Sequence, residues 1–197
     1  MDEKQWERLS RLMAFHLRHD ANIERSPEGY VSVRKLAEVI RRKMPWVKPH
    51  HIREVAVFDT RSRYELDGEL IRARYGHSID VRLDLPEADR DILYCAVSPE
   101  ASPQIFSEGL KPADRKMVHL SATVDNALEV GRSHLENPTV LVVDVRLAKK
   151  MGVKILRASD RVYLAQSIPP ECIRPLERGD IQAGGEPELR NQAPNSS

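Results

Sequence analysis

Apolar side chains recur at helical spacing along the first third of the chain. The first series consists of Trp6, Leu9, Leu12, Met13 and Leu17. It predicts an amphipathic helix over residues 3–19. A second series predicts a helix over residues 34–44, which Pro45 ends. Pro49 suits the first turn of a third helix, which extends to residue 58.

Strand signals accompany these helices. Residues 29–33 read as a short strand, and residues 63–66 and 69–73 as two strands joined at Asp67-Gly68, a strong hairpin signal. A helix, a short strand, two helices and a hairpin are typical of a winged-helix lobe, which we predict for residues 1–85. Winged helices bind nucleic acids or proteins, so the fold alone does not choose a function.

The second half is rich in strands. Strands are predicted at 92–97, 118–120, 139–145, 153–157 and 161–165, and short helices at 99–108, 123–131 and 146–151. The apolar run Val140-Leu141-Val142-Val143 predicts a strand buried on both faces. We therefore expect an α+β protein with a second lobe over residues 89–177, a linker at 85–89, and a disordered polar tail at 178–197.

The overall composition says little about function, whereas the distribution of charge along the chain is more informative. The 197 residues are 41% hydrophobic and 31% charged, with a net charge of +1, which is ordinary for a globular protein. No signal peptide and no apolar run near the ~18 residues of a membrane span occur, so a soluble, cytoplasmic protein is expected. Residues 34–53, however, carry many cations and one acid, Glu38. We expect Arg41, Arg42 and Lys43 to contact nucleic-acid phosphates.

Metal and nucleotide motifs are not evident. Cys95 and Cys172 lie far apart without CxxC spacing, so neither a zinc site nor a disulfide framework is indicated, although one disulfide stays open. His16 and His19 share a helical face without a third ligand at fixed spacing, and no metal is expected. No GxGxxG or GxxxxGK[ST] pattern occurs, which excludes the common Rossmann and P-loop phosphate cradles.

One segment concentrates anion-binding and proton-handling groups. Residues 71–78 (Ile-Arg-Ala-Arg-Tyr-Gly-His-Ser) leave a predicted strand and end in Gly-His-Ser. Two arginines on a strand often form only a solvated face, so this segment is not decisive alone.

Four motifs in order resemble one family. They are Leu17-Arg18-His19, residues 71–78, Glu108-Gly109-Leu110-Lys111-Pro112, and Val118-His119-Leu120-Ser121. Together with Arg161-Val162-Tyr163-Leu164 and Ile168-Pro169-Pro170, they are similar to the RNA 2′-phosphotransferases, called KptA in prokaryotes. The resemblance runs from about Leu9 to Leu176.

The resemblance implies a winged-helix lobe, an ADP-ribosyltransferase-like lobe that binds NAD, and an active site between them. The implied reaction removes an internal 2′-phosphate from RNA, such as a tRNA splice junction. The phosphate attacks the nicotinamide-bearing ribose carbon and expels nicotinamide, and the ribose 2″-hydroxyl then attacks the phosphorus. The products are RNA with a 2′-hydroxyl and ADP-ribose 1″,2″-cyclic phosphate. A monomer with NAD as co-substrate is expected.

The resemblance also assigns residues. Arg18 and Arg72 match phosphate-binding arginines, whose fixed fork suits phosphate, and His19 matches the adjacent histidine. His119 and Ser121 match the strand that holds the nicotinamide ribose. Further implied positions are Cys95 and Gly109 toward the cofactor, and Gly76, His77 and Ser78 in the crevice near the phosphate.

Two departures from the family pattern occur. The family's last arginine follows Val-Gly-x-Arg, whereas here Arg132 comes one residue early in Val130-Gly131-Arg132-Ser133-His134. We assign Arg132 to that catalytic role. The family usually has Tyr-His-Gly-Thr where this chain has Tyr94-Cys95-Ala96-Val97, so a histidine that touches NAD is missing.

Two alternatives remain open. One is ADP-ribosyl transfer to another acceptor, a terminal phosphate or a protein, for which Glu171 is the nearby candidate for a catalytic glutamate. The other is a winged-helix DNA-binding regulator whose second lobe senses a ligand.

Overall fold

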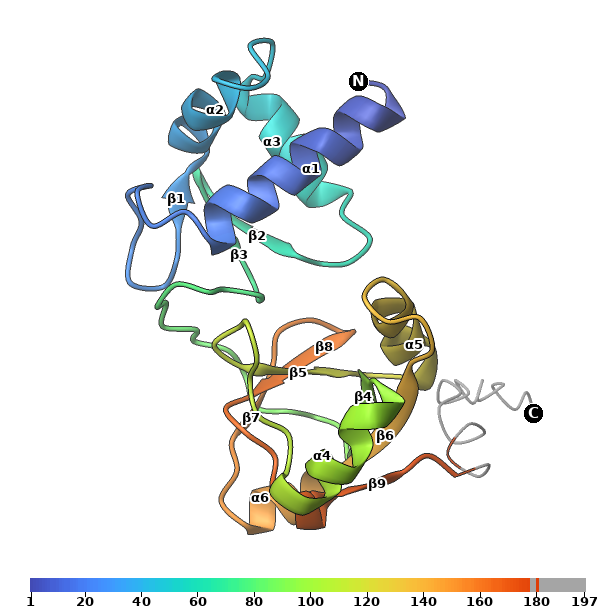
Figure 1. The fold of residues 1–197 in the computed structure, drawn as a ribbon. Helices are drawn as coiled ribbons and strands as arrows, with labels where there is room; N and C mark the ends of the chain where they lie inside the picture. Colours follow the sequence, from blue (N-terminus) through green and yellow to red (C-terminus); the bar gives the residue numbers. More distant parts are fainter. Residues whose placement is uncertain (178–179, 181–197) are drawn as a thin grey trace, which may run out of the picture.

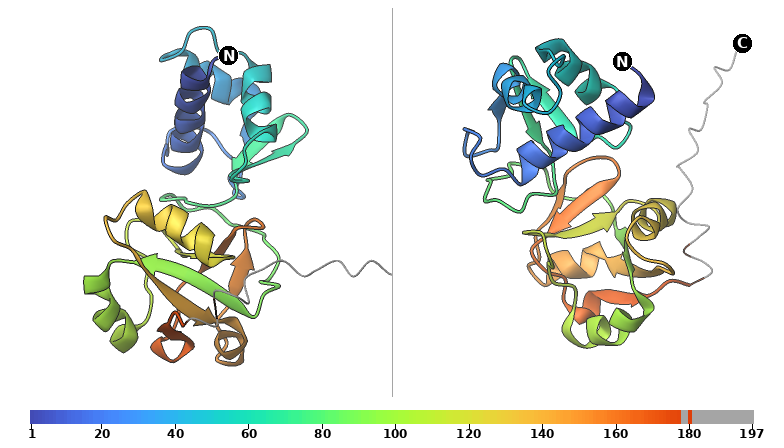
Figure 2. Two further views of the ribbon diagram at one scale, coloured as in Figure 1. Left: turned by 90° about the vertical axis from the view of Figure 1, so that its right-hand side faces the viewer. Right: turned by 45° about the horizontal axis from the view of Figure 1, so that its top comes forward.

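The polypeptide forms two lobes, one above the other, joined by an extended segment (Figure 1). The computed structural model describes residues 1–177 and 180. Two further views show the same separation of the N-terminal lobe from the strand-rich C-terminal lobe (Figure 2). The chain mixes helices and strands in both lobes, as the α+β prediction requires. The tail predicted to be disordered lies outside the described residues, apart from Asp180.

Three helices and a small antiparallel sheet make the N-terminal lobe. The helices are α1 (Glu3–Arg18), α2 (Val33–Arg41) and α3 (Pro49–Val57), and the sheet has the order β1-β3-β2. Their apolar faces meet in a core that includes Leu9, Met13, Leu17, Leu36, Ile40 and Ile52. The three predicted helices are confirmed. The second ends at Arg41 rather than at residue 44, because a turn after Ile40 keeps Met44 buried without continuing the helix.

The predicted hairpin is present with a small shift. Strands β2 (Tyr64–Asp67) and β3 (Leu70–Ala73) are joined by Gly68 and Glu69, so Asp67 ends the strand instead of occupying the turn. Gly68 adopts a φ of +55°, which explains the glycine. Strand β1 (Val31–Ser32) pairs with the other side of β3 and is shorter than predicted.

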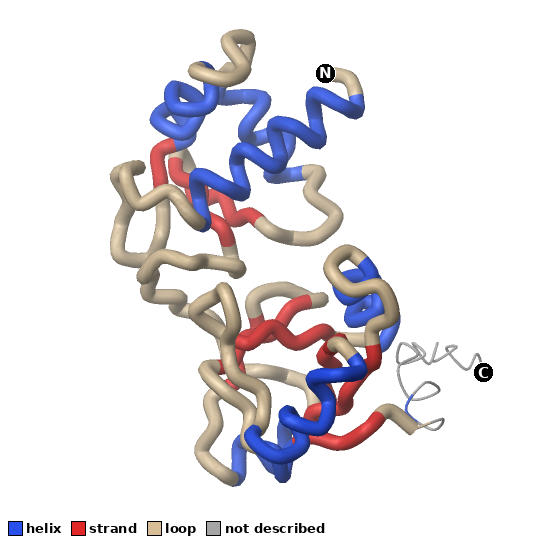
Figure 3. The backbone as a smooth tube through the Cα atoms, viewed as in Figure 1, coloured by secondary structure: helices blue, strands red, loops and turns tan. Residues whose placement is uncertain are grey.

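A six-stranded antiparallel sheet, within the described residues, organises the C-terminal lobe. Its order is β7-β8-β5-β4-β6-β9. The strands are β4 (Ile92–Val97), β5 (Val118–Ser121), β6 (Thr139–Asp144), β7 (Ile155–Arg157), β8 (Val162–Ala165) and β9 (Ile173–Pro175). The tube drawing shows loop, not regular structure, carrying the chain from β3 to β4 (Figure 3).

Helices cover both faces of this sheet. Val140 and Val142 belong to the small core that includes Ala127 of α5 (Val124–Arg132), whereas Leu141 and Val143 belong to the main core of the lobe. That main core also contains Ala148 of α6 (Val145–Lys150) and Cys172 of the 3-10 turn η2 (Pro170–Cys172), and α4 (Ser102–Glu108) contacts η2. The other 3-10 turn, η1 (Pro99–Ala101), leads into α4. The prediction that residues 140–143 are buried on both faces is confirmed.

The two middle strands of this sheet part from each other. Within the described chain, β4 and β5 share one registered pair, Tyr94 opposite Ser121. By contrast, β4 pairs with β6 along its whole length. A wedge therefore opens beside Tyr94 between the two strands. Among residues 1–177 and 180, no helix has the length and apolar character needed to cross a bilayer.

Candidate functional site at the junction of the lobes

A cavity of about 350 Å³ is lined by residues of both lobes. Its floor is the wedge where β4 and β5 part, formed by Cys95, Ala96, His119 and Leu120. The remaining lining residues include Arg18, Arg61, Arg63, Tyr75, Arg115, Ser121, Asn126, Glu129, Ser133, His134 and Arg161. Cations dominate this set, so the cavity suits an anionic ligand.

Arg18 is the last residue of α1 and contributes a buried guanidinium to the cavity. Its guanidinium carbon lies 5.0 Å from the ring centre of Tyr75. The Nε and Nη2 atoms are buried and have no hydrogen-bond partner within the described part of the chain. Burial is the main reason that the pKa of Arg18 is lowered from 12.5. The group is thus a preorganised donor pair for an anion.

Residues 76–78 pack against Arg18 and help to fix its position. Gly76 has a φ of +87°, and a Cβ built there would lie 3.1 Å from the Arg18 guanidinium carbon. Ser78 N–H donates to the Arg18 carbonyl (3.1 Å), and Ser78 Oγ lies 2.9 Å from Nδ1 of His19. Burial, followed by the charge of Arg18, lowers the pKa of His19. The two motifs predicted from sequence therefore meet in space.

His119 presents one ring nitrogen to the site. Its Nδ1 lies 3.0 Å from the Met117 carbonyl, which can only accept, so Nδ1 carries the proton. The buried Nε2 atom has no partner among residues 1–177 and 180. Burial, with Arg115 second, lowers the pKa of His119 to about 3. The ring is therefore neutral near pH 7 and Nε2 can accept a hydrogen bond, while the neighbouring Ser121 lines the same cavity.

Cys95 and Ala96, of the unusual segment Tyr94-Cys95-Ala96-Val97, line the cavity. Burial raises the pKa of the Cys95 thiol to about 12, so it stays protonated. Ala96 packs under α5, where a Cβ on Gly131 would lie only 2.7 Å from the Ala96 Cβ. Glycine at 131 is therefore what allows the helix to approach this strand closely.

Arg72 does not line the cavity. Its guanidinium is buried against Glu65, with Nη2 2.9 Å and Nε 3.1 Å from Oε2, and it lies over the Tyr30 ring at 4.6 Å. Arg74 instead reaches the C-terminal lobe, with Nη1 3.5 Å from the Ala158 carbonyl. The role of Arg72 at the phosphate stays a prediction, and it would require the side chain to leave Glu65.

His77 lies behind the main cavity. It is 4% exposed, and neither ring nitrogen has a partner in the described residues. Burial, then Arg18, lowers its pKa to about 4. His77 and Gly76 line a second, smaller cavity of about 280 Å³, which shares His119 with the first.

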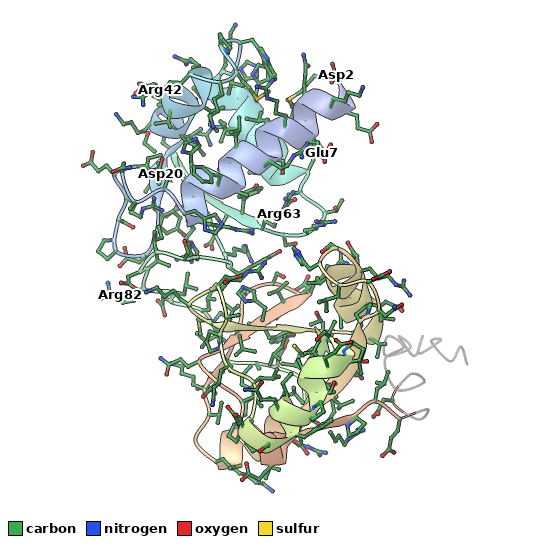
Figure 4. The ribbon with its side chains drawn as sticks, viewed as in Figure 1. Asp2, Glu7, Asp20, Arg42, Arg63 and Arg82 are labelled. Atoms are coloured by element: carbon green, nitrogen blue, oxygen red, sulfur yellow. The ribbon has the colours of Figure 1, made fainter. Side chains whose placement is uncertain are left out.

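Five further predicted positions lie outside the cavity lining. Arg132 is exposed at the end of α5 and is outside the lining, which takes Ser133 and His134 instead. Gly109 ends α4 with a φ of +82°, and a Cβ there would overlap the Ile168 carbonyl oxygen. Its role in the structure is close packing. In the basic set, Arg41 is the last residue of α2, and Arg42 and Lys43 follow it. Figure 4 shows Arg42 well away from Arg63, which lines the cavity.

Sequence reasoning missed five charged residues of the lining: Arg61, Arg63, Arg115, Glu129 and Arg161. Four of them lie in loops, whose direction is set by tertiary packing. Glu129 lies one helical turn after Asp125 in α5, on a face that the sequence pattern marks simply as polar. The sequence offered one signal that Arg161 lies near the site: it directly precedes strand β8, which pairs with the strand that contains His119.

No cluster of three or more His, Cys, Asp or Glu side chains placed to hold a metal occurs in the described residues. His16 instead pairs with Asp20, Nδ1 to Oδ2, at 2.7 Å. Cys95 and Cys172 are both free thiols.

Comparison with known proteins identifies the family. Residues 4–167 match the model of the RNA 2′-phosphotransferase, Tpt1 / KptA family. The chain belongs to this family. The match spans both lobes and the cavity between them, and it confirms the resemblance inferred from the four motifs.

Individual relatives agree with this assignment. The chain is 37% identical to "Probable RNA 2'-phosphotransferase 1" of Archaeoglobus fulgidus, over 85% of this chain and 80% of the relative. It is 38% identical to "Probable RNA 2'-phosphotransferase" of Pyrococcus horikoshii, over 84% and 96% respectively. The protein of the same name from Hyperthermus butylicus is 40% identical, over 84% of this chain and 78% of the relative.

Proposed function

We propose that this member of the RNA 2′-phosphotransferase family removes an internal 2′-phosphate from RNA with NAD as co-substrate. The observation that carries the proposal is that Arg18 and His119 line one cationic cavity, while residues 76–78 pack against Arg18 and Ser78 lies in hydrogen-bond distance of His19. Within this proposal the N-terminal lobe is the winged-helix, RNA-binding part and the C-terminal lobe is the ADP-ribosyltransferase-like part. RNA from a ligation junction, such as a spliced tRNA, is the expected substrate.

The lining is chemically suited to NAD. A dinucleotide brings two phosphates and ribose hydroxyls, and the cavity offers arginines, the Ser121 hydroxyl and the bare Nε2 atom of His119. His119 and Ser121 would hold the nicotinamide ribose, as the family resemblance implies. NAD supplies an electrophilic ribose carbon whose leaving group is nicotinamide.

The chain's own residues bind and orient. The 2′-phosphate is already an anion, so its attack needs no general base, and Arg18 would align it and offset charge on its oxygens. His19 follows Arg18 in the chain and its Nδ1 atom lies 2.9 Å from Ser78 Oγ; in this proposal it binds a phosphate oxygen or moves a proton. The Cys95 thiol stays neutral and takes no nucleophilic part.

A second candidate is ADP-ribosyl transfer to another acceptor. Its support is that Arg72 is engaged by Glu65 and that Arg132 lies outside the cavity, which leaves fewer arginines for the second, transesterification step. Glu171, the glutamate suggested from sequence, lies in η2 and outside the cavity lining, whereas Glu129 lies inside it.

The deciding assay incubates the protein with a 2′-phosphorylated oligonucleotide, with and without NAD, and follows the phosphate. Conversion to a 2′-hydroxyl only with NAD is the expected result. A stable ADP-ribosylated product would favour the second candidate. No reaction, together with tight binding to duplex DNA, would overturn both in favour of a DNA-binding regulator.

A further inference from the structure

An ion triad of Arg61, Glu129 and Arg161 forms part of the cavity lining. Glu129 projects from α5 between arginines of the two lobes. Its Oε1 atom lies 3.4 Å from Nη2 of Arg61, in the loop before β2, and its Oε2 atom contacts Nη2 of Arg161, just before β8. The amide oxygen of Asn126, oriented toward Arg161, accepts from Nη2 at 2.9 Å and from Nε at 3.2 Å.

Arg61 and Arg161 are arranged like an anion-binding site whose present occupant is the Glu129 carboxylate. Among the described residues that line the cavity, Glu129 is the one acid, whereas five arginines line it. Two guanidinium groups converge on one carboxylate, and the planar guanidinium binds phosphate oxygens in the same manner. The three side chains are between one-third and two-thirds exposed, so a soluble anion can reach them.

The triad is also separate from the Arg18 group. Arg18 is positioned by Gly76, Tyr75 and Ser78, and it has no contact with Glu129 in the described structure. Tyr75 connects the two places, because its hydroxyl donates to the Arg61 carbonyl at 2.8 Å while Arg18 lies over its ring. One cavity thus contains two cationic centres that could bind two different phosphates.

We propose that Arg61 and Arg161 form a second phosphate subsite, and that Glu129 is a built-in competitor that an incoming phosphate ester displaces. This inference rests on the proposed function for its ligand class. The phosphate belongs either to the diphosphate of NAD or to the RNA backbone beside the 2′-phosphate. Displacement of Glu129 would also break its ion pair with Arg61, which is the contact of this triad that joins the two lobes.

The test measures binding, not turnover. Calorimetric titrations with NAD, with 2′-phosphorylated RNA, and with inorganic pyrophosphate are compared for the wild type, Glu129→Gln, Arg161→Gln and Arg61→Gln. Glu129→Gln should increase the affinity for the ligand that uses the subsite by about 3- to 10-fold, because a neutral amide no longer competes with it for the two arginines. Arg161→Gln should weaken the same ligand by about 10-fold, and Arg61→Gln by less because it is more exposed.

The ligand arms identify the source of the phosphate. Changes confined to NAD assign the subsite to its diphosphate, and changes confined to RNA assign it to the backbone. Lys154→Gln, which removes an exposed cation of the same lobe outside the cavity, should leave all three affinities unchanged. Thermal unfolding of each variant checks that the fold is retained.

Two results would overturn the inference. In one, Glu129→Gln weakens binding as Arg161→Gln does, which would make the triad a structural bridge between the lobes. In the other, pyrophosphate and both substrates bind all four proteins equally. Failure of the wild type to bind NAD and RNA would instead count against the proposed function, and the pyrophosphate titration would still decide the subsite.

Discussion

Gly76 and Arg18 are complementary: the missing side chain of the one is the space that the guanidinium of the other occupies. A Cβ at position 76 would lie 3.1 Å from both Nε and Cζ of Arg18. The glycine of Gly-His-Ser therefore serves the arginine of Leu-Arg-His, fifty-eight positions earlier (76 − 18 = 58). This relationship leads to a first prediction.

Gly76→Ala should lower 2′-phosphate removal by about 10- to 100-fold, because the added methyl group shifts the Arg18 guanidinium relative to the phosphate. It should also destabilise the fold by about 1 kcal/mol, because its φ is positive. Gly68→Ala is the matched control, since φ there is +55° and nothing lies within 4 Å of the new Cβ. Steady-state kinetics with equal losses in the two variants would show that backbone strain, and not Arg18, is responsible.

Arg72 should have a large effect on stability. Arg72→Ala leaves Glu65 without its buried partner, so we expect a loss of about 3 kcal/mol in the free energy of unfolding, measured with urea. The double variant Arg72→Met/Glu65→Met should recover most of that loss. If the recovered protein still removes 2′-phosphate at the wild-type rate, Arg72 is structural and its predicted catalytic role is wrong.

Gly109 provides a test of packing against cofactor binding. Gly109→Ala should destabilise the protein by about 2–4 kcal/mol, since the new Cβ overlaps the Ile168 carbonyl oxygen. Gly152→Ala shares the positive φ but meets nothing within 4 Å, and it should cost far less. Calorimetry on the folded fraction of Gly109→Ala should give an unchanged affinity for NAD. A selective loss of that affinity would restore the cofactor role.

Acid should destabilise the fold through its buried histidines. The folded pKa values of His119 (about 3) and His77 (about 4) lie below the ordinary 6.5. The unfolded chain therefore binds more protons in acid, and stability present above pH 6.5 is lost as the pH falls toward 3. Each pKa unit corresponds to about 1.4 kcal/mol, so the loss amounts to several kcal/mol. Urea midpoints from pH 7 to pH 4 should fall less steeply in His119→Gln.

The basic set beyond α2 should affect long RNA alone. Arg42→Gln/Lys43→Gln removes two exposed cations at a distance from the cavity, so the chemistry on a very short substrate should be unchanged. Affinity for a long RNA should fall, and its salt dependence should weaken by a slope of about 1 to 2. Lys150→Gln/Lys154→Gln on the other lobe is the control. Equal effects of the two pairs would indicate general charge attraction.

Much of this architecture could be predicted because periodicity and turn chemistry are local. The spacing of Leu9, Met13 and Leu17 yields α1, and the apolar run at 140–143 yields a strand that is buried on both sides. Strand β9 was missed because three residues that include Pro175 carry no periodic signal. The helix after residue 33 was predicted too long, because a buried turn residue, Met44, imitates helical spacing.

The site was only partly predictable for a different reason. Family motifs identified Arg18, His19, Ser78 and His119, which the fold brings together. They could not indicate that Glu65 lies opposite Arg72 and neutralises it. That pairing follows from the hairpin register, and a turn placed at residues 68–69 instead of 67–68 predicts it directly. The loop arginines 61, 115 and 161 depend on tertiary packing and carry no local signal.

The single rung between β4 and β5 has a mechanical consequence. Backbone pairing continues through β7, β8 and β5 on one side and through β4, β6 and β9 on the other, and within the described residues Tyr94 opposite Ser121 is where these halves join. Backbone hydrogen bonds therefore contribute little to the contact between the two halves. Side chains supply most of it, because Leu93 and Leu120 belong to one core and Cys95 Sγ lies 3.8 Å from the His119 carbonyl oxygen. A substitution that loosens this side-chain packing should therefore disturb the floor of the cavity before it disturbs either half of the sheet.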